Sequence, residues 1–542
     1  MTLVLFLIVT VGSAGIALIG RGRAGVAVTA GLLGLTGATV TAIAIDPTIV
    51  IEVGGSVLAT SAYARLFLIL GSTVGLALAL VGPAAGSRRD APAVTLGTLG
   101  AMGLALSLPD PRIAVLASTA GGLLGVLLTL VPGGGRVGAT VGIREIRALI
   151  VAGAMATAAT AWIGRDLSQL IAQPVVFGLA YFAFGLAVAV RFGAIPFHVW
   201  AARLTDSVPE SALPIVTAWG PAAFAVVALA WVDSSVAPLL VDMDAERAII
   251  LAIAIATISL AAFAALIQDD IEHVVGYSII GDAGVVLLAI AALDPEAWAP
   301  ARTWILAYVV ARSAFAAWAA AMRATFFTGR VADMGGWALR APLLAMGLGI
   351  IVIASIGLPG LAAFDARMQL VDIALDPPLQ GLVFLATFLP LLYYGRLAAI
   401  GVVRPDPALG GESGFVGLPR RTPMDRTGIH TSAVTFWTAN RAPSAVLVSL
   451  LVAVLALTVS AGGFGGPAAA AGLPPGQQGP SEPFEPGPVP GVDESFPADE
   501  SLPPIDESFP VDESPPAVDE SSPVDESLPV QESQPVGASP SP

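Results

Sequence analysis

The chain has 542 residues, of which 56% are hydrophobic and only 12% are charged, and its mean hydropathy is +0.83. Soluble domains carry about 25% charged residues, so this composition excludes a soluble enzyme and indicates a membrane protein. Cysteine is absent, which excludes disulfides, thiolate zinc sites and iron–sulfur clusters held by the chain's own residues.

Apolar stretches long enough to cross a bilayer follow one another along most of the chain. We place them near 2–20, 24–45, 63–85, 92–108, 112–131, 146–163, 172–191, 209–232, 247–267, 273–292, 301–322, 341–375, 380–402 and 443–465. The stretch 341–375 is too long for one straight span and contains Gly357, Pro359 and Gly360, so we interpret it as a broken helix. The sequence therefore predicts an all-α polytopic membrane protein with about 14 transmembrane helices.

Charges in the connecting loops predict how these spans are oriented. Arginine gathers in the loops after the first, third, fifth, eleventh and thirteenth stretches, whereas the loops after even-numbered stretches are acidic or have no net charge. Arginine-rich loops tend to stay in the cytoplasm, so we expect a multi-pass protein of the inner (cytoplasmic) membrane with both termini outside. The loop after the ninth stretch departs from the pattern, because it carries Asp269, Asp270 and Glu272.

The last part of the chain differs in composition from the rest. The net charge is −15, and fifteen of the 40 acidic residues follow Ser481 with no basic residue among them, which leaves 25 acidic against 25 basic residues elsewhere. Asp-Glu-Ser repeats between prolines are typical of disorder. The sequence therefore predicts a transmembrane domain, 1–466, and a disordered Pro/Asp/Glu/Ser-rich tail, 467–542.

The stretch "RFGAIPFHVW", 191–200, closes an uncharged run of spanning length. Pro196 interrupts the ladder of backbone hydrogen bonds, and such breaks line cavities in transporters. Arg191 precedes the break and His198 follows it. An ionisable residue at membrane depth is a candidate functional residue, because its burial costs at least a few kcal/mol. Snorkelling of Arg191 to the interface is the alternative.

Three further stretches, 265–288, 306–322 and 354–375, place ionisable residues in apolar surroundings. Together with 191–200 they predict a polar axis across the membrane interior. The candidate ion or proton pathway residues are Arg191, His198, Asp282, Arg312, Asp365 and Arg367. The predicted helix breaks are Pro196, Gly357, Pro359 and Gly360, and the polar motif residues are Gln268, Asp270, Glu272, His273, Tyr277 and Ser278.

These stretches resemble the antiporter-like membrane subunits of respiratory complex I, membrane-bound hydrogenases and Mrp cation/proton antiporters. The family pattern of Lys, four residues and Pro-Phe-His-x-Trp is similar to 191–200, where Arg191 stands in place of the lysine. The pattern Gln-x-Asp-Ile-Lys-Arg-Leu-Leu-Ala-Tyr-Ser-Ser-Ile is similar to 268–280, and Gly-Ile-Pro-Pro-x-x-Gly-Phe-x-x-Lys to 357–367. Residues 61–66 resemble a segment of the N-type subunit of NADH-quinone oxidoreductase.

The resemblance extends over roughly residues 1–460. It implies a fourteen-helix fold with two inverted five-helix repeats, broken seventh and twelfth helices and a central polar axis. It further implies that the chain takes part in proton or cation translocation coupled to electron transport, beside other membrane subunits of a respiratory or hydrogenase-type complex. Quinone and redox centres would lie on those partners, so the chain itself would bind no cofactor or metal and would be at most a non-redox subunit. The sequence indicates contact with the lipid bilayer and none with nucleic acid.

The chain departs from the family where protons are thought to be carried. Family lysine positions hold Arg191, Arg312 and Arg367, and arginine does not release its proton in proteins. The fifth stretch, 112–131, has no counterpart of the family glutamate, and 214–231 has no basic residue. The family's Lys-Arg pair is replaced by Glu272-His273.

Two interpretations follow from these departures. In the first, the arginines act as fixed charges while His198, Asp282 and Asp365 exchange protons. In the second, the chain is a degenerate, non-conducting structural subunit of such a complex. Retention of cations at three family positions, each at a cost in burial energy, favours the first. A stand-alone cation/proton antiporter and a metabolite transporter are further alternatives.

Overall fold

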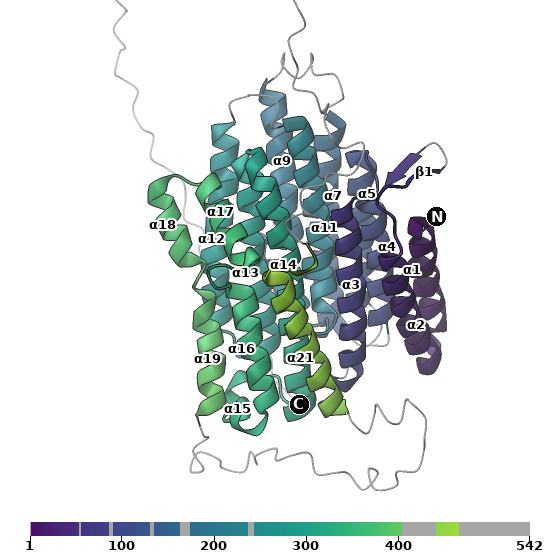
Figure 1. The fold of residues 1–542 in the computed structure, drawn as a ribbon, viewed down its shortest axis with the longest axis vertical. Helices are drawn as coiled ribbons and strands as arrows, with labels where there is room; N and C mark the ends of the chain where they lie inside the picture. Colours follow the sequence, from purple (N-terminus) through teal and green to yellow (C-terminus); the bar gives the residue numbers. More distant parts are fainter. Residues whose placement is uncertain are drawn as a thin grey trace, which may run out of the picture. The chain divides into compact units, whose positions relative to one another are not determined.

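The computed structural model describes residues 2–53, 56–85, 90–130, 135–162, 174–236, 243–403 and 441–465. Within these ranges the chain is helical apart from one antiparallel hairpin of β1 (Val50–Val53) and β2 (Ser56–Ala59), paired from Val50 with Ala59 to Val53 with Ser56. Figure 1 shows the helices as a bundle of roughly parallel and antiparallel rods. The acidic tail predicted for 467–542 lies outside the described residues, so its disorder stays a prediction.

The first part of the bundle consists of the helices that precede Val232. They are α1 (Thr2–Ile19), α2 (Ala24–Ile43), α3 (Ala62–Val81), α4 (Ala91–Ala105), α5 (Pro111–Gly125), α6 (Leu127–Leu130), α7 (Gly135–Trp162), α9 (Pro174–Phe192), α10 (Val199–Leu204) and α11 (Gly220–Trp231). Two π-helical segments, Ile215–Trp219 and Val232–Val236, flank α11. Side-chain caps fix some starts: Ser61 accepts a hydrogen bond from the Ala64 amide, and Asp110 accepts one from the Arg112 amide.

The second part of the bundle combines long helices with shorter ones. They are α12 (Asp244–Leu266), α13 (Ile271–Ala292), α14 (Trp298–Phe326), α15 (Trp337–Arg340), α16 (Pro342–Ile356), α17 (Ala362–Ala374), α18 (Pro377–Ala386), α19 (Pro390–Val402) and α21 (Arg441–Ser460). Short 3₁₀ turns lie at Gly20–Gly22, Gly82–Ala85, Pro295–Ala297, Val331–Met334 and Gly463–Gly465.

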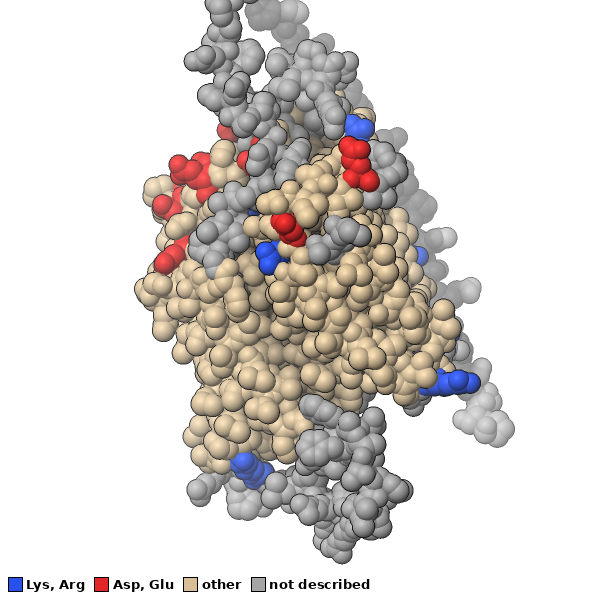
Figure 2. Space-filling view, turned by 45° about the vertical axis from the view of Figure 1, so that its right-hand side comes forward, with Lys and Arg blue, Asp and Glu red and all other residues tan. Residues whose placement is uncertain are grey.

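Among the described residues, eleven helical segments are long and apolar enough to cross a membrane, and α4 and α16 are shorter apolar helices. The chain is therefore a polytopic all-α membrane protein, and the count of fourteen spans stays a prediction. Figure 2 shows a broad surface without charge, with acidic side chains confined to its upper part and only arginine in its lower part. Such a band matches the hydrocarbon core of a bilayer.

The centre of the bundle is α14. Its spanning window is entirely buried, and it packs against α3, α13, α16, α17 and α21 (Figure 1). A helix that is apolar and buried on all sides belongs in the middle of a bundle. Any charged side chain of α14 therefore needs a partner inside the protein.

Two helices are interrupted within the bundle. At each interruption, side chains form hydrogen bonds with backbone groups that have lost their helical partners. The first break separates α9 from α10, and its Gly193 has φ +64°, a conformation that favours glycine. There the Trp200 indole donates to the Val190 carbonyl at 2.9 Å, and the Ile195 amide donates to Thr257 at 3.1 Å.

The second break separates α16 from α17, and Gly357 there has φ +74°. Arg367 from α17 donates to the Ile356 carbonyl at the end of α16. At both breaks a side chain of the second half-helix thus reaches back to the carbonyl end of the first, where the helix dipole is negative.

Candidate functional site

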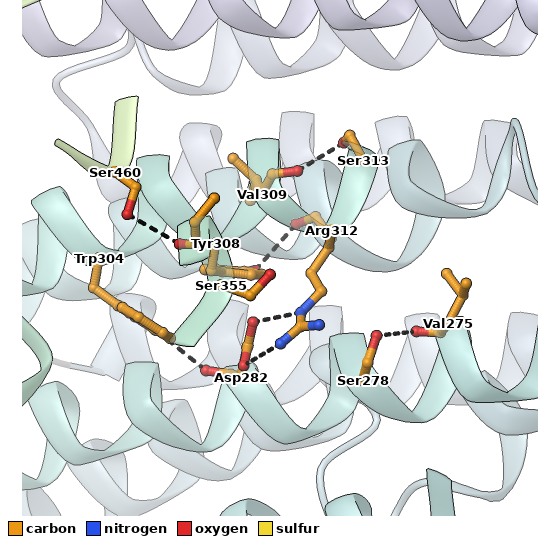
Figure 3. Close-up of polar contacts among 12 residues, drawn as sticks. Val275, Ser278, Asp282, Trp304, Tyr308, Val309, Arg312, Ser313, Ser355 and Ser460 are labelled. Atoms are coloured by element: carbon orange, nitrogen blue, oxygen red, sulfur yellow. Dashed lines mark hydrogen bonds and ion pairs between the residues drawn. The ribbon is translucent and has the colours of Figure 1, made fainter. Parts of the chain in front are cut away.

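The best-formed polar contact in the interior joins Arg312 of α14 to Asp282 of α13. Arg312 Nε and Nη2 lie 2.6 Å and 2.9 Å from the two carboxylate oxygens, a bidentate arrangement (Figure 3). Arg312 Nη1 donates to the hydroxyls of Tyr393 at 3.1 Å and Tyr394 at 2.8 Å, and Tyr394 donates to Ser355 at 3.2 Å. Every nitrogen of this buried guanidinium is therefore occupied.

Arg367 is the second buried cation of this region, and it has no acidic side chain of its own. Its guanidinium carbon lies 5.5–5.7 Å from the ring centres of Trp304, Phe364 and Phe388, so cation–π attraction supplements its bond to Ile356. Its Nε has no hydrogen-bond partner among the described residues. Arg367 thus acts first as a cap of the broken helix.

A small cavity of about 20 Å³ is lined by both Arg367 and Asp282 of the ion pair. Its polar lining consists of Tyr277, Ser278, Asp282, Thr387 and Tyr393 together with Arg367. A space of this kind, lined by several hydrogen-bonding groups, is suited to water. The predicted residues of 277–282 and 367 are therefore brought together at one site.

Arg191 lies in the other half of the axis, near the end of α9, and is only 2% exposed. Its Nε, Nη1 and Nη2 have no hydrogen-bond partner in the part of the chain that the structure describes. Snorkelling is therefore ruled out as the reason for its position. A Cβ added to Gly122 of α5 would lie 2.9 Å from Arg191 Cζ, and one added to Gly220 of α11 would lie 3.1 Å from Nη2.

Glu145 is a functional candidate that the sequence patterns missed. The apolar pattern predicts a span over 146–163, which leaves Glu145 in a loop, but α7 begins at Gly135 and carries Glu145 into the interior at 0% exposure. Thr129 donates to Glu145 Oε2 at 3.3 Å, whereas Oε1 has no partner within the described ranges. The fifth stretch lacks a carboxylate, as its sequence shows, and Glu145 of α7 provides a buried carboxylate in this half of the bundle.

Aromatic side chains lie between the two buried charge clusters. Trp219, in the π-helical segment before α11, donates to Ser313 of α14 at 3.0 Å. Tyr308 of α14 donates to the Ala218 carbonyl at 3.4 Å. The segment 214–231, which has no basic residue, thus contacts α14 here through neutral, closely packed groups. Single-turn π segments are frequent at functional sites.

Two predicted pathway residues lie away from these clusters. Asp365 is exposed, and its carboxylate accepts a bond from the Gly360 amide at 3.4 Å, because α17 turns that position outward while Arg367 points inward. Its predicted place on the interior axis is therefore corrected. His198 is half-buried beside Tyr277, with ring centres 6.2 Å apart. Pro196 is exposed in the break, after a cis peptide bond.

The polar motif at 268–273 forms an ionic cluster at one end of the bundle. Arg323 lies 2.8 Å from Glu210 and also contacts Glu272, and His273 lies 3.0 Å from Asp206. Glu210 is only 1% exposed, and burial raises the pKa of its carboxyl against the opposing effect of Arg323. Glu210 is the second functional candidate that the sequence patterns missed.

The other motif residues, Gln268 and Asp270, contact backbone and side chains of neighbouring segments. Asp270 pairs with Arg330 in an isolated β-bridge, and Arg396 donates to the Gln268 carbonyl at 2.6 Å. The Gln268 amide donates back to Ala264 at 2.8 Å. The acidic loop after the ninth stretch thus contacts Arg330 of a later loop and Arg396 of α19. Ion pairs join its Glu272 to Arg323 and its Asp269 to Arg396, the latter at 3.8 Å.

Metal-ligand groups are absent from the described ranges: no three His, Asp or Glu side chains lie close enough together to hold an ion. In the part of the interior that the structure describes, buried arginine and carboxylate side chains lie beside each helix break. Such regions suit charge compensation and proton exchange along a membrane-embedded path.

Residues 149–392 match the family model described as NADH:quinone oxidoreductase/Mrp antiporter, TM. The resemblance to the antiporter-like membrane subunits is confirmed. The matched region of this antiporter-like chain contains Arg191, Asp282, Arg312 and Arg367, whereas Glu145 lies just before it.

Two curated relatives are named as subunit N of NADH-quinone oxidoreductase. NADH-quinone oxidoreductase subunit N of Parvibaculum lavamentivorans is 30% identical over 231 residues, which are 42% of this chain and 47% of that protein. Subunit N of Hydrogenovibrio crunogenus is 28% identical over 246 residues, 43% of this chain and 50% of that protein. The antiporter-like chain thus matches about half the length of these relatives.

Solved structures show that the likeness in fold extends further. A chain of the Mrp complex from Dietzia sp. superposes with a TM-score of 0.67 at 18% identity, over 87% of this chain and 97% of that one. A chain of respiratory complex I from Thermus thermophilus gives a TM-score of 0.63 at 20% identity, over 87% and 100%. At these identities the comparison concerns the fold alone.

Proposed function

We propose that the chain is a membrane subunit of a proton-translocating complex of the NADH-quinone oxidoreductase or Mrp type. In this complex it takes part in moving protons or other cations across the membrane. The observation that carries the proposal is the paired arrangement of buried charge. Arg191 and Glu145 lie beside the break after α9, and Arg312 and Asp282 lie beside the break after α16. The names of the curated relatives support the same type of complex.

The retained acids favour conduction over a degenerate, structural role. Buried ion pairs contribute little to stability compared with well-packed apolar residues, so a subunit kept only for assembly gains nothing from them. Because arginine stays protonated, it cannot exchange protons, and the carboxylates are the groups that do so. Asp282 and Glu145 are then the exchanging groups that the axis offers, with the arginines as fixed compensating charges.

The same proposal extends to partners, cofactors and orientation. Other membrane subunits of the complex are the partners, and quinone and redox centres are theirs, because this chain has no cysteine to hold a cluster. We place both termini on the outer side, with the Glu210–Arg323 cluster at the cytoplasmic end, since arginine-rich loops favour that side.

The first experiment is purification of the tagged full chain from native membranes in a mild detergent, with mass spectrometry of the co-eluting proteins. Quinone-reductase or hydrogenase subunits in stoichiometric amounts are the expected result. Co-elution with cation/proton antiporter subunits only would move the assignment to an Mrp-type complex. Elution of the chain alone would overturn the complex-subunit assignment and favour a stand-alone antiporter.

A further inference from the structure

Arg367 of α17 is a buried cation without a counter-charge of its own. It is 3% exposed, and no carboxylate of a described residue forms an ion pair with it. Asp282, which lines the same cavity, is already bound at both oxygens by Arg312 (Figure 3). Since arginine stays protonated, two guanidinium charges against one carboxylate leave a net positive charge. A charge buried in this way is costly unless an opposite charge lies beside it.

The other partners of Arg367 attract it but bring no net charge. Its guanidinium carbon lies 5.5–5.7 Å from the centres of three aromatic rings, and it donates to the Ile356 carbonyl. Ring faces and carbonyl oxygens carry only partial negative charge. Its Nε has, in addition, no hydrogen-bond partner among the described residues. Arg367 therefore keeps both an uncompensated charge and a free donor.

Two tyrosine hydroxyls add donors to the cavity. The Tyr393 hydroxyl accepts a hydrogen bond from Arg312 at 3.1 Å, which leaves its own proton free, and no described residue accepts that proton. The Tyr277 hydroxyl likewise forms no hydrogen bond with a described residue. Ser278 and Thr387 also line the cavity, but each donates at 2.7 Å to a backbone carbonyl three residues earlier. The lining thus offers two free hydroxyl protons besides the guanidinium.

The size of the cavity limits what these donors can hold. Its volume of about 20 Å³ gives room for one particle of roughly the size of water. A phosphate or carboxylate group, with several heavy atoms, is too large. Much of the remaining lining is apolar and includes Ile258 and Ala262 of α12 and Val285 of α13. A single-atom anion meets these limits, because it brings one negative charge on one centre that accepts hydrogen bonds from all sides.

We propose that this cavity binds one small monovalent anion of halide size, held by the Arg367 guanidinium and the hydroxyls of Tyr277 and Tyr393. The anion is the counter-charge of Arg367. A water molecule at the same place would accept the same hydrogen bonds but would leave the net charge unchanged. The Asp282 carboxylate, the acidic group of the lining, is balanced by Arg312. The proposal goes beyond the proposed function, because it concerns binding alone and holds whether or not the chain conducts.

The test compares bromide with gluconate, an anion too large for the cavity. The full chain is purified in detergent without halide, and its thermal unfolding midpoint is measured in sodium bromide and in sodium gluconate at equal ionic strength. A ligand that binds only the folded chain raises the midpoint in proportion to its occupancy. The matched variants are Tyr393→Phe and Tyr394→Phe. Both remove a hydroxyl that accepts from Arg312, but only Tyr393 lines the cavity.

We expect bromide to raise the wild-type midpoint above its value in gluconate. Tyr393→Phe is expected to weaken the apparent affinity for bromide by about tenfold or more, the effect of one hydrogen bond to an ion. Tyr394→Phe is expected to leave that affinity near the wild-type value. Equal midpoints of wild type in bromide and gluconate would overturn the proposal and leave water alone in the cavity. An equal bromide response in wild type and Tyr393→Phe would also overturn it, because the ion would then bind elsewhere.

Arg367→Gln removes the excess charge, and we expect it to abolish the bromide response. An unchanged response in this variant would overturn the proposal. If Arg367→Gln does not fold, the two tyrosine variants decide. Anomalous diffraction from crystals soaked in bromide locates the ion without reference to stability. A peak within hydrogen-bond distance of Arg367 and Tyr393 supports the site, whereas peaks only at the surface would show adventitious ions and overturn it.

Discussion

Trp200 donates its indole N–H to the carbonyl of Val190 at 2.9 Å, across the break between α9 and α10. A backbone carbonyl at a helix break inside a membrane has no water to bind it. The hydrogen bond from Trp200 therefore explains why a tryptophan follows the motif's Pro196. The equivalent position in the other broken helix is filled by Arg367, which binds the Ile356 carbonyl.

Removal of the indole donor is predicted to destabilise the chain. Trp200→Phe keeps an aromatic ring but removes one of the two hydrogen bonds to the Val190 carbonyl, which also accepts from the Gly193 amide at 3.1 Å. The expected loss is that of one hydrogen bond, about 0.5–1.5 kcal/mol of unfolding free energy. Denaturant unfolding in detergent measures the change. Trp162→Phe is the control, because Trp162 is 67% exposed at the end of α7. Equal stability of the two variants would show that Trp200 contributes through packing alone.

The contact between Asp282 and Arg312 is predicted to behave as a single unit. Arg312→Gln or Asp282→Asn alone leaves a buried, unpaired charge, and either is expected to cost about 3–5 kcal/mol. The double variant removes both charges and is expected to cost less than the sum of the two single changes. A double-mutant cycle on thermal or denaturant unfolding measures this coupling. Additive losses would contradict the bidentate geometry.

Gly193 is predicted to tolerate no side chain. Its φ of +64° is unfavourable for other residues, and an added Cβ would overlap that of Ala201. We expect Gly193→Ala to lower the unfolding free energy by at least about 1 kcal/mol. Gly349→Ala is the matched control within α16, since nothing lies within 4 Å of an added Cβ there. That variant is expected to be neutral or stabilising by up to about 1 kcal/mol.

The main features of the fold were predictable because they depend on local pattern. Runs of apolar residues locate the spanning helices, and Pro196 and Gly357 mark the breaks, because each residue changes the backbone conformation directly. Buried arginines were also recognisable from their apolar surroundings. Arg367, however, faces three aromatic rings and a carbonyl, a role that only its tertiary neighbours reveal.

Two buried acidic residues, Glu145 and Glu210, were not predictable, because their burial depends on residues far away in the chain. Glu145 stands between Arg144 and Arg147, so its stretch looks like a polar loop until α7 is seen to begin ten residues earlier, at Gly135. Glu210 lies near the start of the predicted stretch 209–232, and the structure places it between α10 and the π-helical segment Ile215–Trp219. Its burial follows from Arg323, more than 100 residues away in the chain. Pairing across such distances leaves no local signal.

The cluster of Glu210, Glu272 and Arg323 predicts a pH dependence of stability. Burial raises the pKa of Glu210 above its ordinary value of 4.5, so the folded chain binds a proton there more readily than the unfolded chain. The resulting stabilisation is complete below that ordinary value and is lost as the pH rises through the folded-state pKa. Glu210→Gln stays neutral at every pH and is expected to show a flatter stability profile above pH 4.5.

Arg323→Gln is the contrasting variant, because it leaves two carboxylates facing each other without their shared cation. It is expected to be less stable than Glu210→Gln at neutral pH, since Glu272 still holds Arg323 in the latter. Its stability should recover as acid protonates the carboxylates. Unfolding midpoints of wild type and both variants, measured from acid to neutral pH, test this pH dependence of stability. Parallel profiles for wild type and Glu210→Gln would mean that Glu210 stays ionised in its pair with Arg323 and does not titrate as proposed.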